Sequence, residues 1–539
     1  MTQVAPPAPG RPPTYFEERF TEAERARLAP YVSNLDGPVF ALVGLPQVTA
    51  AAVLARYSRS AKSLRRLLLD EFLVDDGGPA ATGDAGRARA GDLFGRVLAE
   101  YGDDSVAQLA GVHLACEQVS QPLAKAIEWG RLASYLEQST RYIPYTDRRH
   151  GRYRYHADPA LVASPLGAVY AAAMDGLFDT YSSLLEPLRD HLDRALPGQD
   201  DERARRRAIR ALALDLARGL LPAGTVSNVG VFASPQALEQ MVLRLRAHPL
   251  PEARAYAELI AAELQAVVPE FVTRLDRPDR GGVWAAYLEE TAAALHAEAA
   301  VVAPQSDGGA EGVRLLDWTA DGEDRVITAS LLPHTAVSFD SLLATVSALP
   351  AERRAELFAA VVGTRRNRRH RPGRGWEHCE YTFEVVSDYG AFRDLQRHRL
   401  MTIQWQSLSP DLGYTIPAEV VDAGLETRWR EAVERAEAAH AAVRKELPEQ
   451  AQYLVTLAHR LRYVMRLNAR EALHMIELRT SPQGHPQYRK VCREMHRLID
   501  EQAGHHLVAA AMRFMGADDV HLPRYHAEAA RSTAAGQLP

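Results

Sequence analysis

Arg397, His398 and Arg399 stand next to one another, and Ser407 follows after a spacer of seven residues. Guanidinium groups are planar donors with a permanent charge, so they match a phosphate group or an anionic heterocycle. The imidazole between them can exchange a proton near neutral pH. Arginines at a helix end often serve only the helix dipole, so the run alone is weak support for a site. A second copy of the motif elsewhere in the chain makes the binding-site interpretation stronger.

The degraded second copy lies 268 positions earlier, where Arg131 precedes Ser139 by the same spacer. It has Trp and Gly where the later copy has Arg397 and His398. It keeps a Glu-x-Ser-x-Arg strip from Glu137 to Arg141, which the later copy has lost. These complementary losses predict two related modules that supply different halves of one anion-binding site.

The segments around the two copies predict both strands and helices. Residues Cys379–Val386 alternate between polar and apolar side chains, as a half-buried strand does. The following Ser-Asp pair is a good N-cap for a helix that we expect to run to Arg399. In the earlier copy, Ser120 precedes a proline and predicts a helix over residues 121–142.

A later helical pattern carries a second group of basic residues. Arg466, Arg470 and His474 recur once per turn, and Asn468 is adjacent. Such a stripe on a helix that packs into a core is costly unless a ligand or carboxylates neutralise it. We therefore interpret this stripe as part of a site.

Composition excludes several classes of protein. The chain has 539 residues, a net charge of −6 and 24% charged residues, which gives no overall attraction to nucleic acid. Only four of the 63 basic residues are lysine, so arginine abundance alone says little about anion binding. Three distant cysteines match neither a disulfide framework nor a zinc site and favour a reducing compartment. Without a long apolar run or a signal peptide, we expect a cytoplasmic protein with no membrane contact.

The length exceeds that of one ordinary domain. Glycine, aspartate and proline cluster at residues 304–322, which predicts a linker between an N-terminal domain, 15–303, and a C-terminal domain, 323–523. We expect a flexible arm at residues 1–14 and a flexible tail at 524–539.

These motifs resemble the flavin-dependent thymidylate synthase family, whose signature is Arg-His-Arg, seven residues and Ser. Arg397, His398, Arg399 and Ser407 match it letter for letter. The Trp-Glu-His run with Glu377, the later helix and the earlier Glu-x-Ser-x-Arg strip resemble further family elements. The resemblance implies an α+β fold of two tandem domains, each a small antiparallel sheet with long helices.

The resemblance also implies a set of site residues. Those expected to hold FAD are Glu377, Arg397, His398, Arg399, Asn468, Arg470 and His474. Those expected to bind the nucleotide are Glu137, Ser139, Arg141, Arg218 and Arg244. Those expected to act in catalysis are Arg479, Arg244 and Ser407, with Arg244 or Arg479 facing the pyrimidine ring. No metal ligand is implied.

The activity implied by the resemblance is reductive methylation of dUMP to dTMP, with 5,10-methylenetetrahydrofolate as carbon donor, NADPH as reductant and FAD as cofactor. Arginines would stabilise negative charge in a water-poor pocket. A homodimer of fused pairs would imitate the family's tetramer. Two alternatives are a uridylate C5-modifying variant and a flavin- or nucleotide-binding pseudoenzyme. A helical nucleic-acid-binding protein that uses the basic loop at residues 365–374 fits less well, because the chain is acidic overall and this loop lacks interleaved aromatic residues.

Overall fold

The computed structural model describes residues 18–73, 106–196, 201–303 and 308–516. The expected arm and tail lie outside these ranges. The chain divides into two compact units, each described by itself. The first contains residues 1–114, 132–134 and 231–295, and the second contains residues 115–131, 135–230 and 296–539. Both units therefore draw on separated parts of the sequence.

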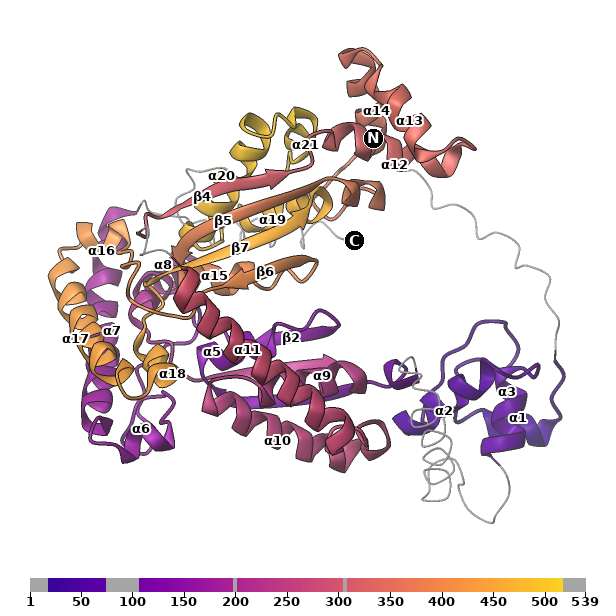
Figure 1. The fold of residues 1–539 in the computed structure, drawn as a ribbon, viewed down its shortest axis with the longest axis horizontal. Helices are drawn as coiled ribbons and strands as arrows, with labels where there is room; N and C mark the ends of the chain where they lie inside the picture. Colours follow the sequence, from indigo (N-terminus) through magenta and orange to yellow (C-terminus); the bar gives the residue numbers. More distant parts are fainter. Residues whose placement is uncertain (1–17, 74–105, 197–200, 304–307, 517–539) are drawn as a thin grey trace. The chain divides into compact units, whose positions relative to one another are not determined.

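Two small sheets and many helices give an α+β fold, as predicted (Figure 1). A three-stranded sheet has the order β1-β3-β2, and a four-stranded sheet has the order β4-β5-β7-β6. Their strands are β1 (Val112–Val119), β2 (Ala133–Glu137), β3 (Ser227–Ala233), β4 (Gly312–Trp318), β5 (Glu380–Asp388), β6 (Met401–Trp405) and β7 (Arg460–Asn468).

The four-stranded sheet lies in the second unit and is antiparallel throughout. β5 and β7 pair along their whole length, from Glu380 opposite Asn468 to Asp388 opposite Arg460. Alternate side chains of both strands are buried, as the period of a strand requires. The helix α20 (Pro486–Glu501) packs against β4 and β5 through one apolar face. This sheet therefore carries the main core of the second unit.

Helices from both halves of the sequence share the second unit. The 29-residue helix α7 (Gly167–Ala195) packs against α17 (Glu426–Arg444) and α8 (Glu202–Ala217). The chain after α8 also pairs with a late segment, because Ala223 N–H donates to the carbonyl of Val455 at 2.7 Å. Segments from both halves of the sequence therefore pack together within the second unit.

Three sequence expectations differ from the observed elements. The predicted helix over residues 121–142 ends at Ile127, where α5 (Gln121–Ile127) stops, and β2 follows. Arg466 belongs to β7 instead of a helix. Residues 312–318, which we expected in the linker, form β4 because they find a partner in β5. The domain boundaries themselves stay a prediction.

The first unit is built mainly from helices, with α9 packed on α10. Its helices are α1 (Glu22–Leu28), α2 (Gln47–Tyr57), α3 (Leu64–Leu67), α9 (Pro235–Arg246) and α10 (Pro251–Val267). The other α-helices are α6 (Pro159–Ala163), α11 (Val283–Val302), α12 (Gly322–Leu331), α13 (Phe339–Ser347), α14 (Ala351–Val362), α15 (Tyr389–Leu395), α16 (Ala418–Asp422), α18 (Pro448–Ala451), α19 (Ala469–Arg479) and α21 (His506–Ala511). None of the helices in the described ranges is long and apolar enough to cross a membrane.

Candidate functional site

The Arg-His-Arg run lies in a turn between two elements of the second unit. Asp388 ends β5 and caps α15, because its Oδ1 accepts from the N–H of Ala391 at 2.6 Å. The helix begins as predicted but ends at Leu395, before the run. A turn presents successive side chains in different directions. Arg397 and Arg399 therefore reach segments different from the one that His398 reaches.

Glu137, at the end of β2, is one point of contact between the two modules. Its side chain is fully buried and forms ion pairs with Arg393 and Arg397 of the later module. It also pairs with Lys125 at 2.9 Å. Burial by itself would raise the pKa of Glu137, but the three cations hold it well below its ordinary value. Glu137 is thus ionised and enclosed, and each of its two carboxylate oxygens already pairs with at least one cation.

Arg141 ends the Glu-x-Ser-x-Arg strip and pairs with Asp215, which lies near the C-terminal end of α8. Its Nε and Nη2 each donate to one Asp215 oxygen at 2.8 Å, which is a bidentate contact. Ser139, half-buried, accepts from the backbone N–H of Arg141 at 3.3 Å. Arg218 is buried, with its Nε 3.2 Å from Asp215. The strip and Arg218 therefore meet at one carboxylate.

Asp394 lies among three arginines from separate parts of the chain. Its carboxylate is 3.5 Å from Arg397, 3.7 Å from Arg479 and 3.9 Å from Arg218. Burial opposes ionisation, but the arginines depress the pKa of Asp394 far below its ordinary value. We call Arg141, Arg218, Arg397 and Arg479, with Asp215 and Asp394, the arginine cluster.

The arginine cluster carries excess positive charge. Its four arginines adjoin Lys125 and Arg393, so the group has six cationic side chains. Four carboxylates face them, namely those of Asp215, Asp394, Glu137 and Glu128. Two positive charges remain. This excess suits a ligand with a dianionic phosphate group.

His398 joins the arginine cluster to α19. Its Nε2 accepts from Arg479 at 3.0 Å, which leaves the ring proton on Nδ1, 2.7 Å from Glu471. Burial, and then the charges of Arg479 and Arg371, lower the pKa of His398 well below its ordinary value. Burial likewise lowers the pKa of His474 to about 4. Both imidazoles are therefore neutral at neutral pH.

The spacing of His398, Glu471 and His474 would admit a metal ion, because their ligand atoms lie within 4.8 Å of one another. The surrounding charges oppose it. Arg479 donates to Nε2 of His398, and Arg371 lies 3.0 Å from Nε2 of His474. A cation would have to displace two guanidinium groups. We therefore assign no metal to this cluster.

The other predicted flavin contacts lie beside this pair of histidines. Arg470 donates to the carbonyl of Pro372 at 2.9 Å and lies 3.4 Å from Glu377. Asn468 caps α19 by accepting from the N–H of Glu471 at 2.9 Å. Arg399 stands over the ring of Tyr135 at 5.7 Å. The contacts of Arg470, Asn468 and Arg399 do not test cofactor binding, so their role in holding FAD stays a prediction.

Two of the three residues predicted to act in catalysis, Ser407 and Arg244, are not part of the arginine cluster. Ser407 is exposed in the loop after β6. Arg244 lies on α9 in the first unit and is therefore described apart from the cluster. Both stay predictions.

Sequence reasoning missed the carboxylates of the site. Asp215 and Asp394 each precede an arginine, Arg218 or Arg397, by three residues. This spacing places acid and base on one face of a helical turn, so it could have indicated the pairing. It also missed His485, whose Nε2 is 4.0 Å from Asp215 and whose pKa burial lowers to about 3.

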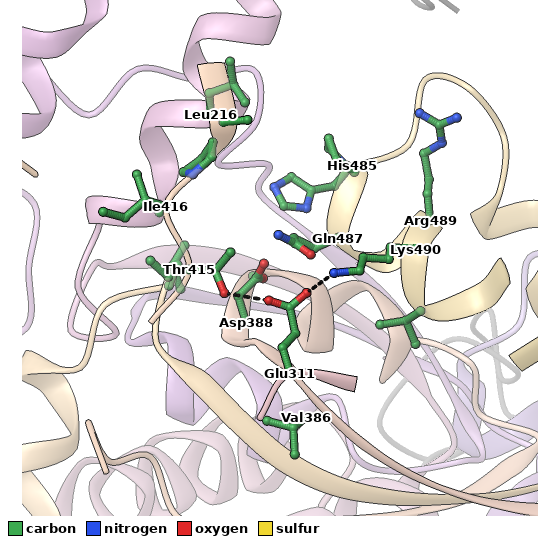
Figure 2. A pocket seen from close by; sticks show the side chains of 18 of the residues that line it. Leu216, Glu311, Val386, Asp388, Thr415, Ile416, His485, Gln487, Arg489 and Lys490 are labelled. Atoms are coloured by element: carbon green, nitrogen blue, oxygen red, sulfur yellow. Dashed lines mark hydrogen bonds and ion pairs between the residues drawn. The ribbon is translucent and has the colours of Figure 1, made fainter. Parts of the chain in front are cut away.

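A cavity of about 1060 Å³ adjoins the arginine cluster at Arg218. It is bounded by the first turns of α20, the end of β5 and residues 415–419. Figure 2 shows the Glu311 side chain within it, contacting Thr415 at 3.1 Å and Lys490 at 2.8 Å. Polar and apolar side chains share this lining, which is typical of ligand sites.

The fold and the site define an α+β protein with a cluster of arginines and carboxylates assembled from both halves of its sequence. The chain belongs to the family described as thymidylate synthase complementing protein, whose model matches residues 47–270 and 314–503. Two matched segments agree with a tandem arrangement of related modules.

Relatives in distant organisms match along nearly the whole chain. A UPF0159 protein of Chlamydia muridarum is 35% identical over 96% of this chain and 99% of its own length. A UPF0159 protein of Chlamydia pneumoniae is 37% identical over 88% of this chain and 91% of its own length. One from Thermoplasma acidophilum is 29% identical over 91% of this chain and 100% of its own length.

Proposed function

We propose that this chain is a flavin-dependent thymidylate synthase-type methyltransferase, which converts dUMP to dTMP with methylenetetrahydrofolate and NADPH. The main support is the arginine cluster, where the strip ending at Arg141 meets Arg397 and Arg479 around Asp215 and Asp394. Family membership supports the reaction class. A cytoplasmic location and a homodimer belong to the same proposal.

The residues near His398 fit FAD. Arg371 and Arg470 offer permanent charge, and the neutral imidazoles of His398 and His474 offer uncharged polar edges. A donor set of this kind matches an anionic dinucleotide. When bound, FAD would supply the redox chemistry. Arg397, His398, Arg470 and His474 would hold it.

The chain's own residues would bind and orient the nucleotide. Arg141 and Arg218 would hold its phosphate, since both lie at the carboxylate of Asp215 and can exchange it for a phosphate oxygen. Arg479 would face the pyrimidine, because His398 orients its Nε. Glu137 would hold Arg393 and Arg397 in place without touching the substrate.

A test of this function starts with the absorbance spectrum of the purified full chain, where bound flavin is expected. Tritium release from C5-labelled dUMP, with methylenetetrahydrofolate and NADPH present, then measures turnover. We expect Arg479→Gln to lower kcat/KM by about 100-fold or more, because it removes a charged contact to the reacting ring. The matched control, Arg435→Gln, changes an exposed arginine of α17 and should leave the rate unchanged.

One second candidate is a flavin- and nucleotide-binding protein without turnover. It is favoured by the existing pairing of Arg141 with Asp215 and of Arg479 with Asp394, which a substrate would have to disrupt. Bound flavin with no tritium release would support this candidate. If the purified protein contains no flavin and releases no tritium, both candidate functions are contradicted.

A further inference from the structure

The helix α11 has 20 residues, and none of them is buried by the part of the chain that the structure describes (Figure 1). The boundary between the two units falls within this helix, after Leu295. Helices in proteins gain most of their stability by packing an apolar face against a neighbour. A long helix that the described residues leave uncovered therefore indicates a surface for a partner.

The large apolar side chains of α11 all lie on one face. With 3.6 residues per turn, they fall within about 140° of the helix circumference. They are Val283, Trp284, Tyr287, Leu288, Leu295, Val301 and Val302. Trp284 is 45% exposed, Tyr287 62% and Leu295 65%. Continuous exposed apolar surface of this extent is typical of an interaction site.

The charges of α11 exclude two kinds of partner. The helix contains Glu289, Glu290 and Glu298 and has no lysine or arginine. Helices that lie on a membrane surface are rich in lysine and arginine on their polar face. Nucleic acid would repel a helix with this net negative charge. The apolar face of α11 therefore fits a protein surface.

The side chains along this face are self-complementary in an antiparallel pair of helices. Large residues stand at both ends, with Trp284 near the start and Val302 at the end. The small side chains of Thr291 and Ala294 lie between them on the same face. When two copies run antiparallel, Trp284 of one protomer meets Val302 of its partner. Leu295 then faces Thr291, so a large side chain meets a small one.

The single charge on the face favours the same orientation. Glu298 is the only ionisable carboxylate among the large apolar residues of this face. In a parallel pair, the two Glu298 side chains would meet within an apolar seam, which is costly. In an antiparallel pair, Glu298 lies near Tyr287 of the other protomer, whose hydroxyl can donate to it.

We propose that the apolar face of α11 pairs antiparallel with the same face of a second copy of this chain. A face about 30 Å long on each of two helices buries on the order of 1,000 Å² in total, which reaches the lower limit for a specific interface. Such an interface has twofold symmetry and closes as a dimer. The inference rests on the proposed function only for the homodimer and is independent of the reaction.

Sedimentation equilibrium of the full chain over a range of concentrations tests the pairing. We expect a dimer, and Leu295→Glu should raise its Kd by about 10-fold or more, because it places a charge in the middle of the apolar face. Ala293→Glu adds the same charge on the opposite, exposed face of α11 and should leave the Kd unchanged. Circular dichroism checks that both variants stay folded. A monomeric wild type, or equal Kd values for the two variants, would overturn the proposal.

Cysteine cross-linking tests the orientation without adding a charge. The three native cysteines are buried, so an exposed cysteine reacts selectively. An oxidised mixture of Thr291→Cys and Leu295→Cys should give a covalent heterodimer, identified by intact mass spectrometry. Leu295→Cys alone should give none. A covalent dimer of Leu295→Cys alone, or no heterodimer in the mixture, would contradict the antiparallel pair.

Failure of this inference and failure of the proposed reaction are distinguishable. A monomeric chain that contains flavin and releases tritium from dUMP would overturn the pairing of α11 and leave the reaction standing. A dimer that Leu295→Glu weakens, without flavin or tritium release, would support the pairing and contradict the reaction.

Discussion

Asp394 shows how single residues determine the electrostatics of the site. It faces Arg218, Arg397 and Arg479 within 4 Å, the range in which a bound phosphate would also face them. The carboxylate is therefore an internal counter-ion that occupies the place of a ligand's charge. An entering anion would compete with it for the same guanidinium groups.

We expect Asp394→Asn to lower the free energy of unfolding by about 3 kcal/mol, because the buried Arg218 and the largely enclosed Arg479 lose a partner. Inorganic phosphate should restore stability to this variant more than to the wild type, since it replaces the missing charge. Thermal unfolding with phosphate, against sodium chloride at equal ionic strength, measures both effects. Asp500→Asn, at a half-exposed pair with His506, is the control. Equal gains in Tm for wild type and variant would contradict the argument.

At the scale of elements, the helix α15 connects the cavity to the Arg-His-Arg run. Its N-cap is Asp388, which lines the cavity, and the run follows its C-terminal end. The helix has only seven residues and every one of them is buried. A change of charge at Asp388 therefore acts at one end of α15 on the cavity and, through the helix, on the Arg-His-Arg run at the other end.

The raised pKa of Asp388 predicts a dependence of stability on pH. Burial lifts it from an ordinary 3.8 to about 7, so in this interval the folded state binds more protons than the unfolded state. Stability from this group is therefore greatest below pH 4 and falls as pH rises to 7. Between pH 4 and 7, the free energy of unfolding of the wild type should fall by about 1–4 kcal/mol relative to that of Asp388→Asn, as measured by chemical unfolding at several pH values. Identical pH profiles for the two proteins would refute this assignment.

At the scale of the whole molecule, the second unit depends on both halves of the sequence. The segment after α8 pairs with residues near Leu457, whose N–H donates to the carbonyl of Leu221 at 2.9 Å. Helices α7 and α17 pack on one another. Each half would expose large apolar surfaces if it were alone.

We expect residues 1–303 and 304–539, produced together as separate chains, to copurify, because the shared core forms without a covalent link. Each chain alone should aggregate or bind hydrophobic dyes. Affinity purification through a tag on one half measures the association. Two halves that each remain folded and soluble by themselves would show that the shared packing is dispensable. Circular dichroism on each isolated chain makes that comparison.

The sequence by itself determined the local features. Asp388 was recognisable beside a helix start, and β5 follows from alternation. These features depend on neighbouring residues, which a pattern contains. The arginine spacing likewise indicated two related modules, as the matched family segments confirm.

Tertiary structure alone decided which charges meet. Residues 133–137 became β2 instead of a helix because they pair in a sheet, and sheet partners lie far away in the sequence. Glu137 was expected at the nucleotide, yet three cations enclose it. The burial of Asp388 also depends on distant segments. Coulombic and desolvation energies follow distance and enclosure in space, and a linear pattern of residues specifies neither.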